Sequence, residues 1–199
     1  MNVRIAQPFS ITAGGWYDDY LEMNQYNIKL WMITQSMSEL EQNIAFRRIK
    51  HFVHYELNST VFIDSAETEK CAELSQAGLN ITTLPGVPAD QLIGIMLFHK
   101  LNAIMEGRIS VVEVEISAGD AVIYLHGEHE TSDDVKQPDW WSTADLIHSD
   151  IIENTENIVS LRSVTRWKDL DLDWPEDSTP TDSGNTIVFA DFKSSDDTK

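Results

Sequence analysis

Apolar and polar residues alternate in several short stretches of the chain, which predicts β-strands. The opening segment carries Ile5, Phe9 and Ile11, which predicts a strand or an extended arm that ends at Gly14-Gly15. Between residues 109 and 116, Val112, Val114 and Ile116 alternate with glutamates, so this strand should bury one face and expose the other. The turn 118–120 then leads into a partner strand at 121–126, which predicts a hairpin. Further strands are predicted at 26–34, 61–63 and 81–84.

Three helices are predicted between these strands. The first begins at Ser38, where Glu41 three residues later fits a capping box, and apolar residues recur at helical spacing up to about Leu57. Arg47, Arg48 and Lys50 are assigned to the outward face of this helix. The second is expected to be capped by Asp64-Ser65 and to end at Gly78. The third, residues 92–105, is apolar almost all round and should therefore lie in the core.

This order of elements predicts an α+β fold with a mixed, mostly antiparallel sheet, about three helices packed on one face and an acidic C-terminal extension. Residues 1–165 are expected to form a single domain. A late strand is possible at 158–164, before the extension begins. Residues 166–199 are expected to form the extension, with a second possible late strand at 186–192 and a frayed tail. Within it, acidic and apolar residues alternate over 169–177, which fits either an edge strand or a disordered interaction segment.

Negative charge is concentrated towards the end of the chain. The formal net charge is −19, and residues 126–199 contribute −12 of it, against −1 from residues 1–60 and −6 from residues 61–125. Such a field repels phosphate backbones and anionic membranes and favours a basic protein surface as partner, so no nucleic-acid or membrane binding is expected. The N-terminus lacks signal-peptide features, and no apolar run is long enough for a transmembrane helix, which predicts a cytoplasmic protein.

The best candidate for a metal site is His126 with Glu128 and His129, where imidazoles and carboxylates lie close together in the sequence. A metal-dependent hydrolase is the enzymatic alternative that this cluster offers. No phosphate-binding loop, dinucleotide fingerprint or nucleophile elbow occurs, and no cofactor is predicted. The single cysteine, Cys71, is expected to be a buried packing residue on a short helix rather than a nucleophile.

Three tryptophans in acidic, turn-rich surroundings are candidates for a protein-binding site. Trp140, Trp141 and Trp174, together with Asp171 and Asp173, form the predicted interaction residues, because indoles ringed by carboxylates resemble binding hot spots. Alternatively, the same indoles attach the C-terminal part of the chain to the sheet. Asn102, Glu106 and Arg108 lie at the end of the third helix and either serve a function or satisfy backbone groups between helix and hairpin.

Two stretches of the sequence, 43–50 running on to 62–64 and 84–108, resemble small uncharacterised proteins of tailed bacteriophages, especially marine ones. The resemblance covers roughly residues 40–165 and implies a setting, the infected bacterial cytoplasm or a virion, but no activity. Three hypotheses result: a non-enzymatic acidic protein that binds a basic surface of a host or phage protein, a metal-dependent hydrolase, and a virion or assembly component. The oligomeric state stays open.

Overall fold

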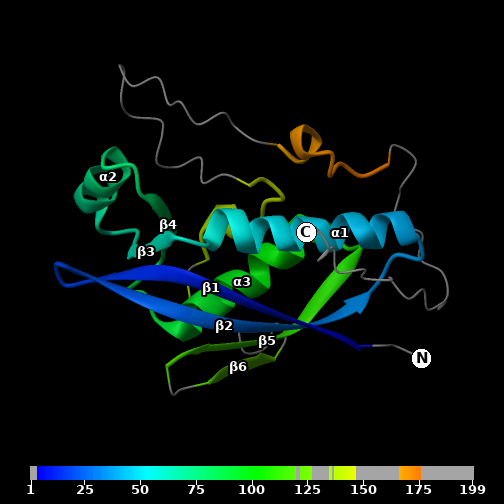
Figure 1. The fold of residues 1–199 in the computed structure, drawn as a ribbon, viewed down its shortest axis with the longest axis horizontal. Helices are drawn as coiled ribbons and strands as arrows, with labels where there is room; N and C mark the ends of the chain where they lie inside the picture. The colour runs from blue at the N-terminus through cyan, green and yellow to red at the C-terminus, as the bar shows by residue number, and fades with distance from the viewer. Residues whose placement is uncertain (1–3, 120–121, 127–134, 136, 147–165, 176–199) are drawn as a thin grey trace, which may run out of the picture.

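The computed structural model describes residues 4–119, 122–126, 135, 137–146 and 166–175. Its strands form one six-stranded sheet in the order β4-β3-β1-β2-β5-β6 (Figure 1). The strands are β1 (Arg4–Tyr17), β2 (Tyr20–Thr34), β3 (Thr60–Asp64), β4 (Asn80–Leu84), β5 (Ile109–Ala118) and β6 (Ile123–His126). The pairs β1–β2, β2–β5 and β5–β6 are antiparallel, whereas β3 pairs in parallel with β1 and β4. Together with the helices α1 (Glu39–His51), α2 (Thr68–Gln76) and α3 (Asp90–Met105), this confirms the mixed α+β class.

Helices α1 and α3 pack against one face of the sheet and enclose the main core. Alternate residues of β1 and β2, such as Ile11 and Leu30, point into this core, where they meet Ile49 of α1 and Leu97 of α3. Residues at the intervening positions of β1 are exposed along most of the strand. The prediction that the apolar third helix lies in the core is therefore confirmed.

Helix α2 packs on the opposite face, at the β3–β4 end of the sheet. Cys71 of α2 lies with Val61, Ile63 and Ile81 in a second, smaller apolar cluster, which Leu74 and Trp16 extend. Phe62, between the two β3 members of this cluster, points instead into the main core. Successive side chains of a strand point to opposite faces of the sheet, so the two clusters lie on opposite faces. The predicted packing of the helices on one face therefore holds for α1 and α3, whereas α2 covers the other face.

The hairpin of β1 and β2 is longer than predicted, because Gly14-Gly15 does not end the first strand. Both glycines pair with β2, opposite Met23 and Glu22. A Cβ atom on Gly15 would lie 2.5 Å from the ring of Tyr17, and one on Gly14 would lie 2.6 Å from Cδ1 of Leu21. A side chain at either position would have to displace these neighbouring side chains, so the two glycines fit close contacts within a continuous strand.

A β-bulge shifts the pairing between β2 and β5. Trp31 pairs with Glu113 and the next residue, Met32, pairs with Val111, so Val112 is the extra residue on β5. As a result Val111 and Val114 are buried, whereas Val112 is only half-buried. The predicted hairpin of β5 and β6 is confirmed, but strict alternation placed Val112 on the wrong face.

Helix boundaries differ from the predicted ones at two points. The Ser38 side chain accepts a hydrogen bond from the Glu41 N–H, but the carboxylate of Glu41 binds Ser36 instead of closing a capping box. Helix α1 continues directly into a π-helical turn, η1 (Phe52–Leu57). Helix α2 begins only at Thr68, since the Asp64 carboxylate accepts the N–H of Ala66 in the preceding turn. No helix in the part of the chain that the structure describes is long and apolar enough to cross a membrane.

Two C-terminal segments fold back onto the helices (Figure 1). Residues 137–146 contain the 3-10 turn η2 (Asp139–Ser142), and residues 166–175, called the strap below, contain the 3-10 turn η4 (Trp167–Leu170). The strap is neither an edge strand nor disordered. Its acidic and apolar alternation has another cause: Leu170, Leu172 and Trp174 pack against the main core, and the intervening aspartates are exposed. The late strands predicted at 158–164 and 186–192 lie outside the described residues.

Candidate interaction site

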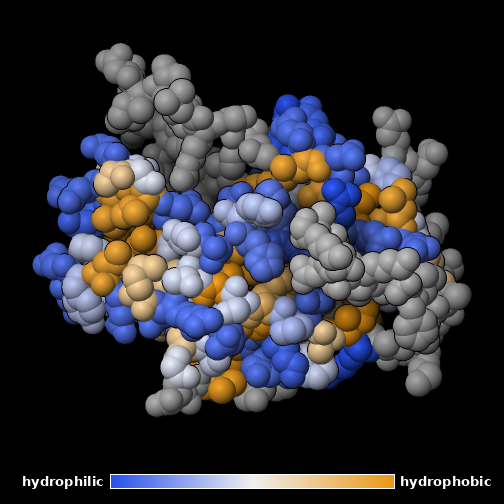
Figure 2. All heavy atoms as spheres, in the orientation of Figure 1, coloured by the Kyte–Doolittle hydropathy of each residue, from blue (hydrophilic) through white to orange (hydrophobic). Residues whose placement is uncertain are grey.

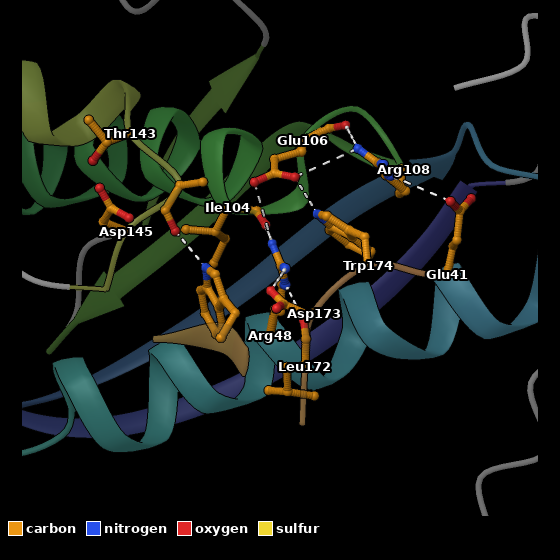
Figure 3. Close-up of polar contacts among 12 residues, drawn as sticks. Glu41, Arg48, Ile104, Glu106, Arg108, Thr143, Asp145, Leu172, Asp173 and Trp174 are labelled. Carbon is orange, nitrogen blue, oxygen red and sulfur yellow. Dashed lines mark hydrogen bonds and ion pairs between the residues drawn. The ribbon is translucent and has the colours of Figure 1, made fainter. Parts of the chain in front are cut away.

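The strap is held by Arg48, a side chain of α1 that is only 1% exposed. Its Nε donates a hydrogen bond to the carbonyl oxygen of Leu172 over 2.8 Å, and its Nη1 donates to the carbonyl oxygen of Ile104 over 3.0 Å. Figure 3 shows the strap residues 172–174 lying between α1 and the C-terminal end of α3, with Arg48 directed at them. Arg48 therefore joins α1, α3 and the strap.

Aromatic and acidic side chains complete the surroundings of Arg48. Its guanidinium carbon lies 3.9 Å from the ring centroid of Trp174 and 4.7 Å from that of Trp167. Glu106 and Asp173 are its ion-pair partners, at 3.7 and 3.9 Å. Burial lowers the pKa of Arg48 to about 10, and these two carboxylates counteract the shift. The guanidinium group is therefore still charged at neutral pH.

Arg108, at the start of β5, extends the same network. Its guanidinium carbon lies 4.6 Å from the ring centroid of Trp174, and its nitrogens lie 3.7 Å from carboxylate oxygens of Glu41 and Glu106. The indole N–H of Trp174 donates to the Glu106 carboxylate (Figure 3). Trp174 is thus enclosed by two arginines and hydrogen-bonded to the carboxylate that both of them share.

Lys100 holds the other C-terminal segment in the same way. It lies fully buried on α3, and its ammonium group donates to the carbonyl oxygens of Trp140, Thr143 and Asp145 at 2.8, 2.8 and 2.6 Å. These three bonds use all the donors of a lysine. Burial lowers the pKa of Lys100 to about 8, so the group is mostly charged at pH 7.

The predicted interaction residues fall into two groups. Trp140 is 5% and Trp141 0% exposed, and Trp174 is half-buried, so the indoles attach C-terminal chain to the core, as the alternative interpretation holds. The prediction of exposed indoles at Trp140 and Trp141 is wrong. Asp171 and Asp173 are exposed, and their contact with a partner stays a prediction.

Asn102 serves the backbone rather than a ligand. Its amide nitrogen donates to the carbonyl oxygens of Phe98 and Val111, and its carbonyl oxygen accepts the N–H of Val111. The backbone role expected for the polar residues at the end of α3 is therefore confirmed for Asn102, whereas a function for these residues stays a prediction. Asn102 satisfies backbone groups where α3 meets β5, whereas Glu106 and Arg108 belong to the arginine network.

The metal prediction at His126, Glu128 and His129 is not tested by the structure. His126 ends β6, and Glu128 and His129 lie outside the described residues. Across the part of the chain that is described, no group of three or more His, Cys, Asp or Glu side chains is arranged to hold a metal ion. Two histidines in that part of the chain contact aromatic rings: His51 stacks on Tyr55, and His99 meets Phe98 edge-on and stacks near Trp141.

The fold removes positive charge from the surface and leaves negative charge on it. Of the ten basic side chains that the structure describes, Arg48, Lys100 and Arg108 are buried and only four are exposed, at positions 4, 47, 166 and 168. Thirteen carboxylates are exposed in the same part of the chain. They belong to Asp18, Asp19, Glu22, Glu39, Glu67, Glu69, Glu73, Glu106, Asp139, Asp145, Asp169, Asp171 and Asp173.

Sequence reasoning placed Arg48 on the outward face of its helix, which is wrong. Arg48 lies four residues after Ile44 and four before Phe52, both buried, so the helical period already placed it on the inner face. Lys100 similarly lies four residues from Met96 and Ile104 in a helix without a polar face. These spacings were the available signals for both residues.

Exposed apolar side chains gather at the tip of the β1–β2 hairpin. Tyr20, Leu21 and Met23 are 55%, 40% and 54% exposed and follow directly after Asp18 and Asp19, which form the turn with positive φ. Figure 2 shows this end of the molecule, over the hairpin tip and α2, as a mixture of hydrophobic and hydrophilic residues. This surface does not coincide with the predicted interaction residues of the C-terminal third.

Comparisons with known proteins give no identification. No protein-family model matches the chain, and no curated protein matches it. Among solved structures, it is similar to an uncharacterised protein, WS1659, from Wolinella succinogenes, with a TM-score of 0.47 and 14% identity over 64% of this chain and 99% of that one. It is also similar to 6-pyruvoyltetrahydropterin synthase from Plasmodium vivax, with a TM-score of 0.41 and 11% identity over 63% of this chain and 98% of the other. Similarity this low supports no conclusion about function.

Proposed function

We propose that this chain is a non-enzymatic, acidic interaction protein that binds a basic surface of another protein. The observation that carries the proposal is the distribution of charge: thirteen described carboxylates are exposed, against four basic side chains. Three further cations are buried, where they fix the strap and residues 137–146 and contribute little to the outer surface. A surface field of one sign accelerates encounter with an oppositely charged partner and disfavours partners of like charge.

The setting forms part of the proposal. The resemblance of residues 40–165 to proteins of tailed bacteriophages favours a partner that belongs to a phage or its host. The protein would then act in the cytoplasm of the infected cell or within a virion.

Titration with a labelled oligolysine, followed by fluorescence anisotropy, tests the proposed charge complementarity. The salt concentration is raised from about 0.1 M to about 1 M, which shortens the Debye length from about 10 Å to about 3 Å. We expect saturable binding whose Kd rises by more than about tenfold over this range. Binding that is insensitive to salt, or equal binding of an oligoglutamate of the same length, would contradict the proposal.

A pair of double variants tests the contribution of the strap. Asp171→Asn with Asp173→Asn removes two exposed carboxylates from it, and Glu39→Gln with Asp139→Asn removes two from elsewhere as a matched control. A larger loss of oligolysine affinity in the first double variant would place the contact on the strap. Equal losses would leave charge complementarity in place and assign the contact to another surface.

A further inference from the structure

The hairpin tip and α2 form one continuous surface on the open side of the sheet. Trp16 pairs with Leu21, and Gly14 pairs with Met23, so the side chains of Trp16, Leu21 and Met23 project from the same face. Trp16 also packs against the cluster that contains Cys71, and the Lys70 ammonium lies 4.9 Å from the centroid of the Trp16 ring. We call this area, from Trp16 to Met23 together with α2, the tip surface.

The apolar side chains of the tip surface are exposed to solvent and lie next to Gly14. Leu21 and Met23 are both exposed, and they occupy the space in which a Gly14 side chain would lie, at 2.6 and 3.2 Å from its Cβ position. Methionine fits irregular partners well, because its side chain is unbranched and flexible. The tip surface thus offers neighbouring apolar side chains that a partner can remove from water.

Carboxylates surround this apolar area. Asp18 and Asp19 lie at the turn, and Glu67, Glu69 and Glu73 lie at or on α2, all exposed. Lys70, the cation beside Trp16, is bound to Glu73 at 2.6 Å. The hydrogen bond to Glu73, together with the charges of Asp19 and Glu67, raises the pKa of Lys70.

We propose that the tip surface is the docking site for the basic partner, and that it takes a short segment in which apolar side chains are flanked by lysine or arginine. This inference rests on the proposed function and locates it. The apolar centre of the surface selects the partner's aliphatic side chains, and the acidic rim selects its flanking cations. An arrangement of this kind, apolar in the middle and polar at the edge, is typical of protein interfaces.

Two labelled synthetic peptides test the docking site by fluorescence anisotropy: one with two leucines flanked by lysines, and one in which serine replaces each leucine. The tip variant is Leu21→Ser with Met23→Ser, and its matched control is Leu40→Ser with Val87→Ser, which removes two comparably exposed side chains elsewhere. We expect the tip variant to bind the leucine peptide at least about tenfold more weakly. The control should bind like the wild type. The serine peptide should bind weakly to all three proteins.

Hydrogen exchange of the wild-type protein supplies a second measurement that needs no variant. Adding the leucine peptide should slow exchange in residues 16–23 and 67–74. Protection confined to the strap, or equal binding of the leucine peptide by the tip variant and its control, would overturn the docking site. Because oligolysine binding tests charge complementarity separately, salt-dependent binding combined with an unaffected tip variant would reject this site and leave the proposed function standing.

Discussion

The indole ring of Trp174 covers the guanidinium group of Arg48, with 3.9 Å between the ring centroid and the guanidinium carbon. A buried arginine is stable only when hydrogen bonds and opposite charges replace the water it has lost. The strap supplies a carbonyl oxygen at Leu172, a carboxylate at Asp173 and the ring of Trp174. We infer that the strap, residues 166–175, is packed as a structural part of the domain.

Replacing Trp174 should therefore lower the free energy of unfolding. Trp174→Ala removes the ring from both arginines and the N–H donor from Glu106, and we expect a loss of about 2 kcal/mol in urea unfolding. Trp174→Phe keeps a ring over Arg48 without the N–H and should lose only about 1 kcal/mol. As a control, Leu40→Ala alters an exposed side chain and should change stability by less than about 0.5 kcal/mol. Equal stability of Trp174→Ala and the wild type would show that the strap does not hold Arg48.

Trp141 should matter for stability and not for binding. The ring is fully buried and stacks near His99, so Trp141→Ala leaves a cavity and should cost about 3–5 kcal/mol in the free energy of unfolding. Oligolysine affinity, measured at a temperature where the variant is folded, should equal that of the wild type. A folded variant of normal stability that binds more weakly would instead restore Trp141 as an interaction residue.

Those parts of the fold that depend on local pattern could be predicted from the sequence. The apolar run of α3 and the alternation at 109–126 each indicate their own element, because burial in the core repeats with the period of the helix or the strand. The bulge at Val112 could not be predicted this way, since it depends on the register between β5 and β2. Gly14-Gly15 was wrongly predicted to end the first strand for a related reason, because the pairing of both glycines with β2 depends on the cross-strand register.

The candidate site was predicted only in part, because its contacts connect distant segments. Arg48 binds carbonyl groups at positions 104 and 172, and Lys100 binds three between 140 and 145. Backbone carbonyl groups carry no sequence signal, so the partners of these cations cannot be read from residue types. The helical spacing of Arg48 and Lys100 did indicate that both side chains point towards the core.

Cys71 should react slowly in the folded protein. The thiol lies in the cluster beneath α2, and burial raises its pKa, which leaves little thiolate at neutral pH. Labelling with iodoacetamide at pH 7.5, followed by mass spectrometry, should be far slower in buffer than in urea. A matched control is Val87→Cys in a Cys71→Ala background, where the thiol is placed at an exposed position and should react readily without urea. Rapid native labelling of Cys71 would contradict its packing role.

Lys100 should make the stability of the protein increase with pH in the alkaline range. Burial lowers the pKa of its ammonium group from 10.5 to about 8. Between these values the unfolded chain holds a proton that the folded chain has released, so raising the pH favours the folded state. The full cost of keeping the ammonium group charged in the core applies below pH 8 and disappears as the pH approaches 10.5.

Urea unfolding at several pH values between 8 and 10 measures this effect. We expect the free energy of unfolding to rise by up to about 2 kcal/mol over the range. The series ends at pH 10, because Arg48, with a pKa lowered to about 10, begins to titrate there, and Tyr26, with a raised pKa, titrates above it. Lys100→Met should abolish the rise, whereas Lys70→Gln on α2 should keep it. Wild-type stability that stays level or falls between pH 8 and 10 would mean that the three carbonyl groups compensate fully for burial of the charge.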